Sequence, residues 1–161
     1  MKRILIGWMA VLLICGCGTP PKTETTKSSG GQEVAVLSDE DYVQEGIEHL
    51  QDAEVTEAIK SFDQAIKQDP LEPEPYLVLS QTYMRLKQYD RAIDTLEAAE
   101  RVAPNRGDIQ YLLAINYGIT GQEDMAKQSA KKSIELFRQD QDEENFMKAV
   151  ALLQGMLKNQ K

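Results

Sequence analysis

The chain has 161 residues, of which 42% are hydrophobic and 27% are charged, and its formal net charge is −8 at pH 7. A nucleic-acid ligand requires a concentration of Lys and Arg to neutralise its phosphates, so this acidic balance argues against nucleic acid as a partner. Anionic lipid headgroups also repel an acidic surface, and attachment to a membrane would therefore have to come from a covalent lipid.

Residues 1–16 have the layout of an export signal. Lys2 and Arg3 precede a mostly apolar run from Ile4 to Cys15, and small residues follow it. The run of about twelve residues is too short to span a bilayer comfortably. We therefore predict a cleaved signal peptide at 1–16.

The string ICGCG at positions 14–18 resembles the lipobox of bacterial lipoproteins, which places a small residue before the lipid-bearing cysteine and an aliphatic residue three before it. Cys17 fits, because Gly16 precedes it and Ile14 lies three before it. The resemblance implies lipidation, including palmitate, at Cys17. The alternative is an ordinary secretory signal cleaved near the same glycines, which would leave the mature protein without an anchor.

Lipidation at Cys17 has consequences for location and charge. Cys17 would be the only cysteine of the mature chain, so no internal disulfide could form. Loss of the two basic residues of the signal would change the formal net charge from −8 to −10. Gly18 follows the cysteine where an Asp would favour the inner membrane, and in the lipoproteins that this sequence resembles this choice favours the outer membrane of a Gram-negative cell.

Residues 17–38 are rich in Pro, Thr, Ser, Gly and Lys, a composition typical of a flexible tether. The tether ends in a short apolar patch at 34–37. Ser38 is predicted to cap the first helix together with Asp41, and Leu37 is predicted to pack on Tyr42 as a hydrophobic staple.

From residue 39 onward the periodicity predicts helices joined by short turns. Pro70 and Pro104 close two of them, and Gly121 lies in a turn. No stretch alternates apolar and polar residues long enough to predict a sheet, so the expected fold class is all-α. The predicted helices are 39–51, 55–68, 73–86, 89–102, 107–119, 122–137 and 142–158.

Small residues recur with a spacing of 34 along these helices, which indicates a helical repeat. One set is Ala58, Ala92 and Ala126, and a second set is Gly46, Ser80 and Ala114. Larger residues recur in step with them. The further columns are Tyr83 and Tyr117; Leu79 and Leu113; Phe62, Leu96 and Ala130; Ala65, Ala99 and Ser133; Pro70 and Pro104.

With these columns, residues 39–138 resemble the tetratricopeptide repeat (TPR) family. The resemblance implies a short right-handed solenoid of three helix-turn-helix repeats. The first helix is the least typical, since Glu45 and His49 occupy columns that are bulky and apolar or aromatic in the other repeats, and Arg138 replaces the proline that closes the first two repeats.

Residues 139–161 are predicted to form a C-terminal capping helix, because repeat arrays need an end element over their last apolar face. Phe146, Ala149, Val150 and Leu153 have the spacing of a first helix of a fourth repeat. Further apolar residues surround this helix. They either pack on the third repeat or form a dimer or partner contact, and those considered are Met147, Leu152, Met156 and Leu157.

In the TPR family the first helix of each repeat lines a groove, and the corresponding positions in this chain are mostly apolar. Such a groove suits an apolar helix or an extended segment of a partner. The alternative is that many of these side chains belong to the core between repeats. The predicted groove residues are Val43, Ile47, Leu50, Leu77, Val78, Gln81, Met84, Arg85, Tyr111, Leu112, Ile115 and Ile119.

Chaperone-binding TPR proteins hold a terminal carboxylate with a clamp of Lys, Asn and Arg on these helices. The helix at 39–51 contains neither Lys nor Asn, so this chain does not reproduce the clamp. Arg85 could still anchor one acidic group.

No catalytic constellation, metal site or cofactor site is predicted. His49 has no cysteine partner in the folded body and lies in a repeat-core column. The acidic run at 140–144 resembles the start of a calcium loop, but it lacks the glycine and the closing glutamate of such a loop. The acidic residues there are expected to cap a helix instead.

The sequence therefore predicts a non-enzymatic adaptor of the bacterial cell envelope, anchored by its lipid and binding a segment of a partner protein in the TPR groove. Pilus assembly, secretion and envelope assembly are the roles that the resemblance implies. The alternative is a structural homo-oligomer that pairs through Met147, Leu152 and Met156 of the C-terminal helix.

Overall fold

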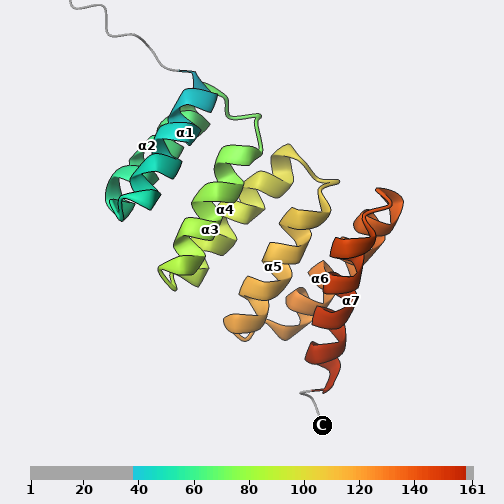
Figure 1. Cartoon of the computed structure of the whole chain (residues 1–161). Coiled ribbons are helices and arrows are strands. Elements are labelled where there is room, and N and C mark those ends of the chain that lie inside the picture. Colours follow the sequence, from blue (N-terminus) through green and yellow to red (C-terminus); the bar gives the residue numbers. More distant parts are fainter. Residues whose placement is uncertain (1–37, 159–161) are drawn as a thin grey trace, which may run out of the picture. The chain divides into compact units, whose positions relative to one another are not determined.

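The computed structural model describes residues 38–158, which form seven α-helices and contain no strand (Figure 1). The all-α prediction is confirmed, and four of the seven predicted helices match at both ends. The predicted signal peptide, Cys17 and the tether up to residue 37 lie outside the described residues. The helices are α1 (Asp39–Gln51), α2 (Val55–Gln68), α3 (Glu74–Arg85), α4 (Tyr89–Val102), α5 (Gly107–Ile119), α6 (Glu123–Gln139) and α7 (Glu143–Lys158).

The first six helices form three hairpins that follow one another along the described part of the chain. α1 packs on α2, α3 on α4, and α5 on α6. Successive hairpins are joined through α2 with α3 and through α4 with α5, and α7 packs on α6 and contacts α5 (Figure 1). Each hairpin therefore buries one face against its neighbour, as in a repeat array.

The small residues of the repeat lie where the two helices of a hairpin approach closely. Ala58 and Ala92 are 0% exposed, and Ala126 is 1% exposed. A Cβ at Gly46 would lie 2.4 Å from Cε1 of Phe62, which is too close for any side chain. The ring of Phe62 thus requires glycine at position 46, and the hairpins close only because these columns are small.

The turn inside each hairpin repeats the same backbone conformation. Ala53, Lys87 and Gly121 all have positive φ, at 62°, 59° and 79°. The next residue donates its N–H to a carbonyl of the last helical turn. These bonds are Glu54 to His49 at 2.8 Å, Gln88 to Tyr83 at 2.9 Å and Gln122 to Tyr117 at 2.8 Å. This pattern is a Schellman motif, which satisfies carbonyls at the end of a helix.

Two helices begin with acidic caps. Ser38 and Asp41 form a capping box at the start of α1, as predicted, and the pKa of Asp41 is lowered by the hydrogen bonds from Ser38. Asp142 accepts the backbone N–H of Asn145 at 3.0 Å at the start of α7. The prediction that the acidic run before α7 caps a helix is confirmed.

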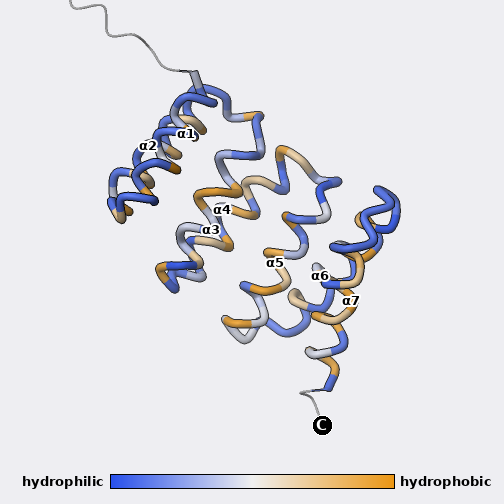
Figure 2. The backbone as a smooth tube through the Cα atoms, in the orientation of Figure 1, coloured by the Kyte–Doolittle hydropathy of each residue, from blue (hydrophilic) through white to orange (hydrophobic). Residues whose placement is uncertain are grey.

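The hydrophobic core of the described residues consists of two clusters that follow the hairpin junctions. One is built by Ala58, Phe62, Leu79, Tyr83 and Ala92. The other joins the second and third hairpins and is built by Leu77, Ile93, Leu96, Ala99, Ile109, Leu113, Tyr117 and Ala126. Figure 2 shows that hydrophobic residues are more frequent along α5 and α7 than along α1 and α2.

The last helix, α7, is only partly covered. Ala149 is 0% exposed against the rest of the protein, and Met156 packs against the second core cluster. Met147 and Leu157 remain 56% and 51% exposed. None of the helices between residues 38 and 158 is long and apolar enough to cross a membrane.

Candidate functional site

One predicted groove residue is a core residue instead. Leu77 is 3% exposed and packs among side chains of α4 and α5, including Ile93 and Ile109. The prediction that Leu77 faces a ligand is therefore wrong. The reason is that the next hairpin covers this part of α3, so that the side chain points into the junction.

Five more of the predicted groove residues are half-buried and pack against the core clusters. Ile47 and Leu50 of α1 and Val78 and Met84 of α3 border the first cluster, and Leu112 of α5 borders the second. These side chains stabilise the junctions and leave only part of their surface to a ligand. The predicted groove is consequently narrower than its twelve residues suggest.

The remaining predicted residues are accessible to different degrees. Gln81, Arg85 and Ile119 are exposed, and Ile119 has 52% of its surface in solvent. Val43, Tyr111 and Ile115 are half-buried, and neither core cluster includes them. The accessible apolar part of the first-helix surface therefore lies mainly on α5.

An apolar groove lies between α5 and α7, beside this part of α5. It encloses about 460 Å³. Its lining combines large apolar side chains with three small residues. We call this the α5/α7 groove, and its lining residues are Ile115, Gly118, Ile119, Ala151, Leu152, Gly155 and Met156.

The small residues of the α5/α7 groove differ in what surrounds them. A Cβ at Gly155 would meet no atom within 4 Å, so this position faces open space. A Cβ at Gly118 would lie 3.5 Å from Cε of Met156 and 3.9 Å from Cβ of Ala126, so Met156 already packs over this glycine. The sequence singles out Leu152 and Met156 as surplus apolar residues but not Gly118, Ala151 and Gly155, because these three small residues belong to none of the repeat columns.

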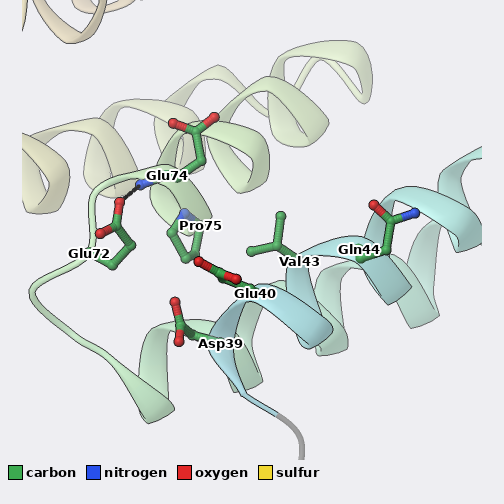
Figure 3. Close-up of a pocket in the computed structure, with 7 residues that line it drawn as sticks. All are labelled: Asp39, Glu40, Val43, Gln44, Glu72, Glu74 and Pro75. Carbon is green, nitrogen blue, oxygen red and sulfur yellow. Dashed lines mark hydrogen bonds between the residues drawn. The ribbon is translucent and has the colours of Figure 1, made fainter. Parts of the chain in front are cut away.

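A second cavity, of about 370 Å³, lies between the starts of α1 and α3. Asp39 and Glu40 come from the first turn of α1, Glu72 comes from the segment that leads into α3, and Glu74 begins α3 (Figure 3). We call it the acidic cavity, and Val43, Gln44 and Pro75 complete its lining. The sequence pattern does not predict this site, because its carboxylates come from two helix starts that are separated by a whole hairpin.

Polar side chains bridge the second and third hairpins. Glu100 of α4 accepts hydrogen bonds from Gln110 of α5 at 2.8 Å and from Lys132 of α6 at 2.6 Å. The bond from Lys132 is the main cause of the lowered pKa of Glu100. Tyr117 donates to Glu97 at 2.7 Å, and burial together with this bond raises the pKa of the phenol. These contacts fix the hairpins and do not resemble a catalytic arrangement.

His49 is tied to the turn that follows its helix. Its Nδ1 lies 2.8 Å from Oε2 of Glu54, and the side chain is 28% exposed. Across residues 38–158, no three His, Cys, Asp or Glu side chains are arranged so that they could hold a metal ion.

Comparison with protein families matches the chain to two models, each described as tetratricopeptide repeat. One covers residues 49–115 and the other covers residues 107–140. Together they include most of the three hairpins. No curated protein sequence matches the chain significantly.

Several solved structures share this fold. PcrH of Pseudomonas aeruginosa, in complex with the chaperone binding region of PopD, has a TM-score of 0.69 at 18% identity, over 76% of this chain and 92% of that chain. The Yersinia enterocolitica type III secretion translocator chaperone SycD, in an alternative dimer, has a TM-score of 0.70 at 17% identity, over 76% and 94%.

The first TPR of Spaghetti (RPAP3), bound to the HSP90 peptide SRMEEVD, has a TM-score of 0.67 at 18% identity, over 80% of this chain and 98% of that chain. At such identities the likeness of these structures concerns the fold.

Proposed function

Because this chain belongs to the tetratricopeptide repeat family, we propose that it is a protein-binding adaptor, held on the bacterial cell envelope by a lipid on Cys17. Its partner is a protein that offers an apolar helix or extended segment. The segment docks in the α5/α7 groove and on the adjoining accessible surface of α5. No cofactor takes part.

The α5/α7 groove is the observation that carries this proposal. A groove with apolar walls and a volume of about 460 Å³ accommodates several side chains of a peptide. Ile119 in its lining is 52% exposed, and Leu157 on α7 is 51% exposed. Binding of an apolar segment would remove this surface from water, which stabilises a complex by about 25 cal/mol per Å² of apolar area before the costs of association.

Solved structures with the same fold support a peptide ligand. PcrH is described in complex with the chaperone binding region of PopD, and the Spaghetti repeat is described bound to an HSP90 peptide. The HSP90 peptide ends in an acidic sequence, whereas this chain is acidic and lacks the basic clamp for such a ligand. The apolar kind of ligand is therefore the better match for this chain.

The envelope location rests on the N-terminal sequence. The lipobox-like string around Cys17 would attach the chain to a membrane, with the outer membrane favoured in a Gram-negative cell. Attachment confines the folded part to a thin zone near the membrane, which raises its concentration around an envelope partner. Pilus, secretion and envelope assembly are the pathways proposed.

Photo-crosslinking tests the binding site. A photoreactive residue at Ile119 in intact cells should capture one discrete envelope protein, identified by mass spectrometry. The matched control is Leu71, which is 77% exposed on the loop between α2 and α3 and should capture none. Equal capture from both positions would contradict a specific groove.

Filling the groove gives a sharper test. Gly155→Leu adds a side chain where no atom lies within 4 Å, so the fold should persist with unchanged helicity while capture from Ile119 falls to background. Gln154→Leu adds the same bulk at an exposed position that does not line the groove, and it should leave capture intact. Undiminished capture in the Gly155 variant would exclude the groove as the binding site.

The anchor is tested separately. Cys17→Ser should release the protein from the membrane fraction without changing its circular dichroism spectrum. A variant that still sediments with membranes would refute lipidation at Cys17 and leave the groove hypothesis standing.

A second candidate function is a homodimer formed through α7. Two observations favour it: Met147 and Leu157 are exposed on α7, and SycD of the same fold is described in an alternative dimer. Sedimentation velocity at several concentrations separates the two candidates. An adaptor should sediment as a monomer, whereas a dimer should dissociate in a Met147→Glu variant.

A further inference from the structure

One position near the end of the first helix of each hairpin changes its residue type along the repeat. The 34-residue period places Leu50, Met84 and Gly118 at this position. Leu50 and Met84 are half-buried and pack against the first core cluster, which contains the small alanines of the first two hairpins. Gly118 has no side chain to fill the equivalent place beside Ala126. The third hairpin therefore lacks a contact that the first two make themselves.

The side chain of Met156, from α7, takes this place in the third hairpin. Its Cε lies 3.5 Å from the point where a Cβ of Gly118 would lie, and Cβ of Ala126 lies 3.9 Å from the same point. Met156 is half-buried and packs against the second core cluster, which contains Ala126. A side chain from another helix therefore supplies the contact that Leu50 and Met84 supply from within their own hairpins.

The side chain of Met156 has room to move. It lines the α5/α7 groove, of about 460 Å³, and also a smaller cavity of about 130 Å³. Gly118 lines both, and Glu123, Ala126 and Lys127 complete the smaller cavity. A methionine side chain is unbranched and flexible, so it can change rotamer while its helix stays in place. Gly118 itself is exposed, so a ligand in the groove can reach the place that Met156 leaves.

We propose that Met156 is a displaceable plug of the α5/α7 groove, and that a methionine or leucine side chain of the partner's segment takes its place over Gly118. This inference rests on the proposed function, because it names the anchor residue of the segment that the groove binds. Binding exchanges an apolar contact within the chain for the same contact with the partner.

The side chains that fill this place in the three hairpins define the chemistry of the anchor. Leu50, Met84 and Met156 are apolar, and none of them branches at Cβ. A β-branched side chain is stiffer at its first torsion and adapts less well to a site beside a helix backbone. A charged side chain would lose its hydration against apolar walls. Methionine and leucine are therefore the best match.

The plug lowers the affinity of the groove in the free chain. Only chains in which Met156 has turned away accept the anchor, so the apparent dissociation constant is the intrinsic one divided by the open fraction. Removing the plug side chain should therefore tighten binding, whereas filling the place from α5 should abolish it. These opposite effects separate a plug from an ordinary core residue, whose removal would only lower stability.

The experiment is a titration of the full-length chain, in lipid nanodiscs and isotopically labelled on its isoleucine methyl groups, with N-acetyl-methionine amide, followed by NMR. Ile115 and Ile119 line the groove and should show saturable shifts, whereas Ile59 of α2 should show none. Met156→Ala should bind the probe at least about threefold more tightly than the parent chain. N-acetyl-glutamine amide, which has a similar length but a polar end, should cause no saturable shift.

Further variants test the assignment of the place over Gly118. Gly118→Met, added to Met156→Ala, restores the residue type of the second hairpin and should abolish probe binding with unchanged helicity. A Cβ at Gly118 is only in ordinary contact with its neighbours, so this change fits the fold. Met125→Ala is the control, since Met125 is 44% exposed and lines neither cavity, and it should bind as the parent chain does.

Met156→Gln guards against a loss of folding in the alanine variant. It keeps the length of the side chain but makes its end polar, so the side chain should leave the apolar place and give the same gain in probe binding. The proposal is overturned if a folded Met156 variant binds the probe no better than the parent chain, or if Gly118→Met leaves the gain intact.

The proposed function and the plug can fail separately. Absence of any capture from Ile119 in cells would refute the proposed partner site, while probe binding to the Met156 variants would still establish the plug. Capture from Ile119 that is unchanged in Met156→Ala, together with no gain in probe binding, would overturn the plug and leave the groove as the partner site.

Discussion

The two junctions between hairpins are built on the same backbone plan from different side chains. The second junction buries Leu77 against Ile109, and it closes its edge with Arg106. The first junction has Val43 at the position of Leu77, half-buried and lining the acidic cavity. One junction is therefore filled by its own side chains, and the other keeps a cavity.

The two junctions also differ in the polar contacts that link their hairpins, and the second junction again has more of its own contacts. In the second junction Glu100 connects α4 with α5 and α6 through Gln110 and Lys132. The residues at the equivalent positions in the first junction are Ile66, which packs beside the first core cluster, and Tyr76, which donates to the carbonyl of Pro70 at 3.1 Å. Polar links between hairpins are thus concentrated in the second junction. A repeat sequence can vary the stability of its junctions while it keeps their geometry.

The largest expected effect comes from the two apolar positions that the period makes equivalent. Leu77→Ala should destabilise the protein by about 2–5 kcal/mol, because it opens a cavity at a site that is 3% exposed. Val43→Ala should cost about 1 kcal/mol or less, because Val43 is half-buried beside an existing cavity. Urea unfolding followed by circular dichroism measures both.

The Leu77 and Val43 variants should keep the slope of the urea transition, which would show that only stability has changed. Equal losses of unfolding free energy in the Leu77 and Val43 variants would contradict the difference between the two junctions. They would mean that the first junction is as well packed as the second.

A smaller effect is expected when the closing cation is removed. Arg106→Glu places three carboxylates together in the second junction and should lower stability by about 1 kcal/mol, since the lost pairs are partly exposed. The loss should shrink as salt is added, because screening weakens repulsion among surface charges. Thermal unfolding at low and high salt measures it, and a loss independent of salt would point to packing by the arginine stem.

The sequence was sufficient to predict the features that depend on the 34-residue period and on hydrogen bonds between residues close in sequence. The seven helices follow from apolar spacing and from punctuation by Pro70, Pro104 and Gly121. The capping roles of Ser38 and of the acidic run before α7 follow from local hydrogen bonding. These features need only residues that are close in sequence.

The candidate site could be predicted only in part, because it depends on what a neighbouring hairpin covers. Leu77 and Ile115 have similar side chains on first helices, yet Leu77 is buried and Ile115 lines a groove. The hollow at Gly155 exists because a residue without a side chain faces open space. The acidic cavity becomes visible only in three dimensions, because its lining comes from the start of α1 and the start of α3.

The polar bridge of the second junction predicts a pH dependence. The pKa of Glu100 is lowered from 4.5, mainly by the hydrogen bond from Lys132. The stability from this carboxylate is therefore present above pH 4.5 and is lost as the pH falls through the lowered pKa, because the unfolded chain binds the proton first. Glu100→Gln should flatten the fall in melting temperature between about pH 5 and pH 3.

The size of the Glu100 effect should be below about 1 kcal/mol, since its side chain is 35% exposed and that of Lys132 is 42% exposed. Ile66→Val, at the equivalent position of the first junction, is the control and should keep the pH profile of the parent chain. An unchanged profile in Glu100→Gln would show that the bridge adds nothing to stability.

A further small effect is expected from the turns, in which glycine holds the positive φ of the third hairpin and other residues hold it in the first two. Lys87 holds the positive φ that Gly121 holds in the third hairpin, at 59° and 79°. A side chain in this conformation costs about 1 kcal/mol, whereas glycine adopts it freely but loses more backbone entropy on folding. Lys87→Gly should therefore raise stability by a few tenths of a kcal/mol, and Gly121→Ala should lower it by about 1 kcal/mol. If Lys87→Gly destabilises the protein instead, the entropy of the unfolded chain outweighs the strain of the turn, and the identity of the turn residue does not distinguish the hairpins.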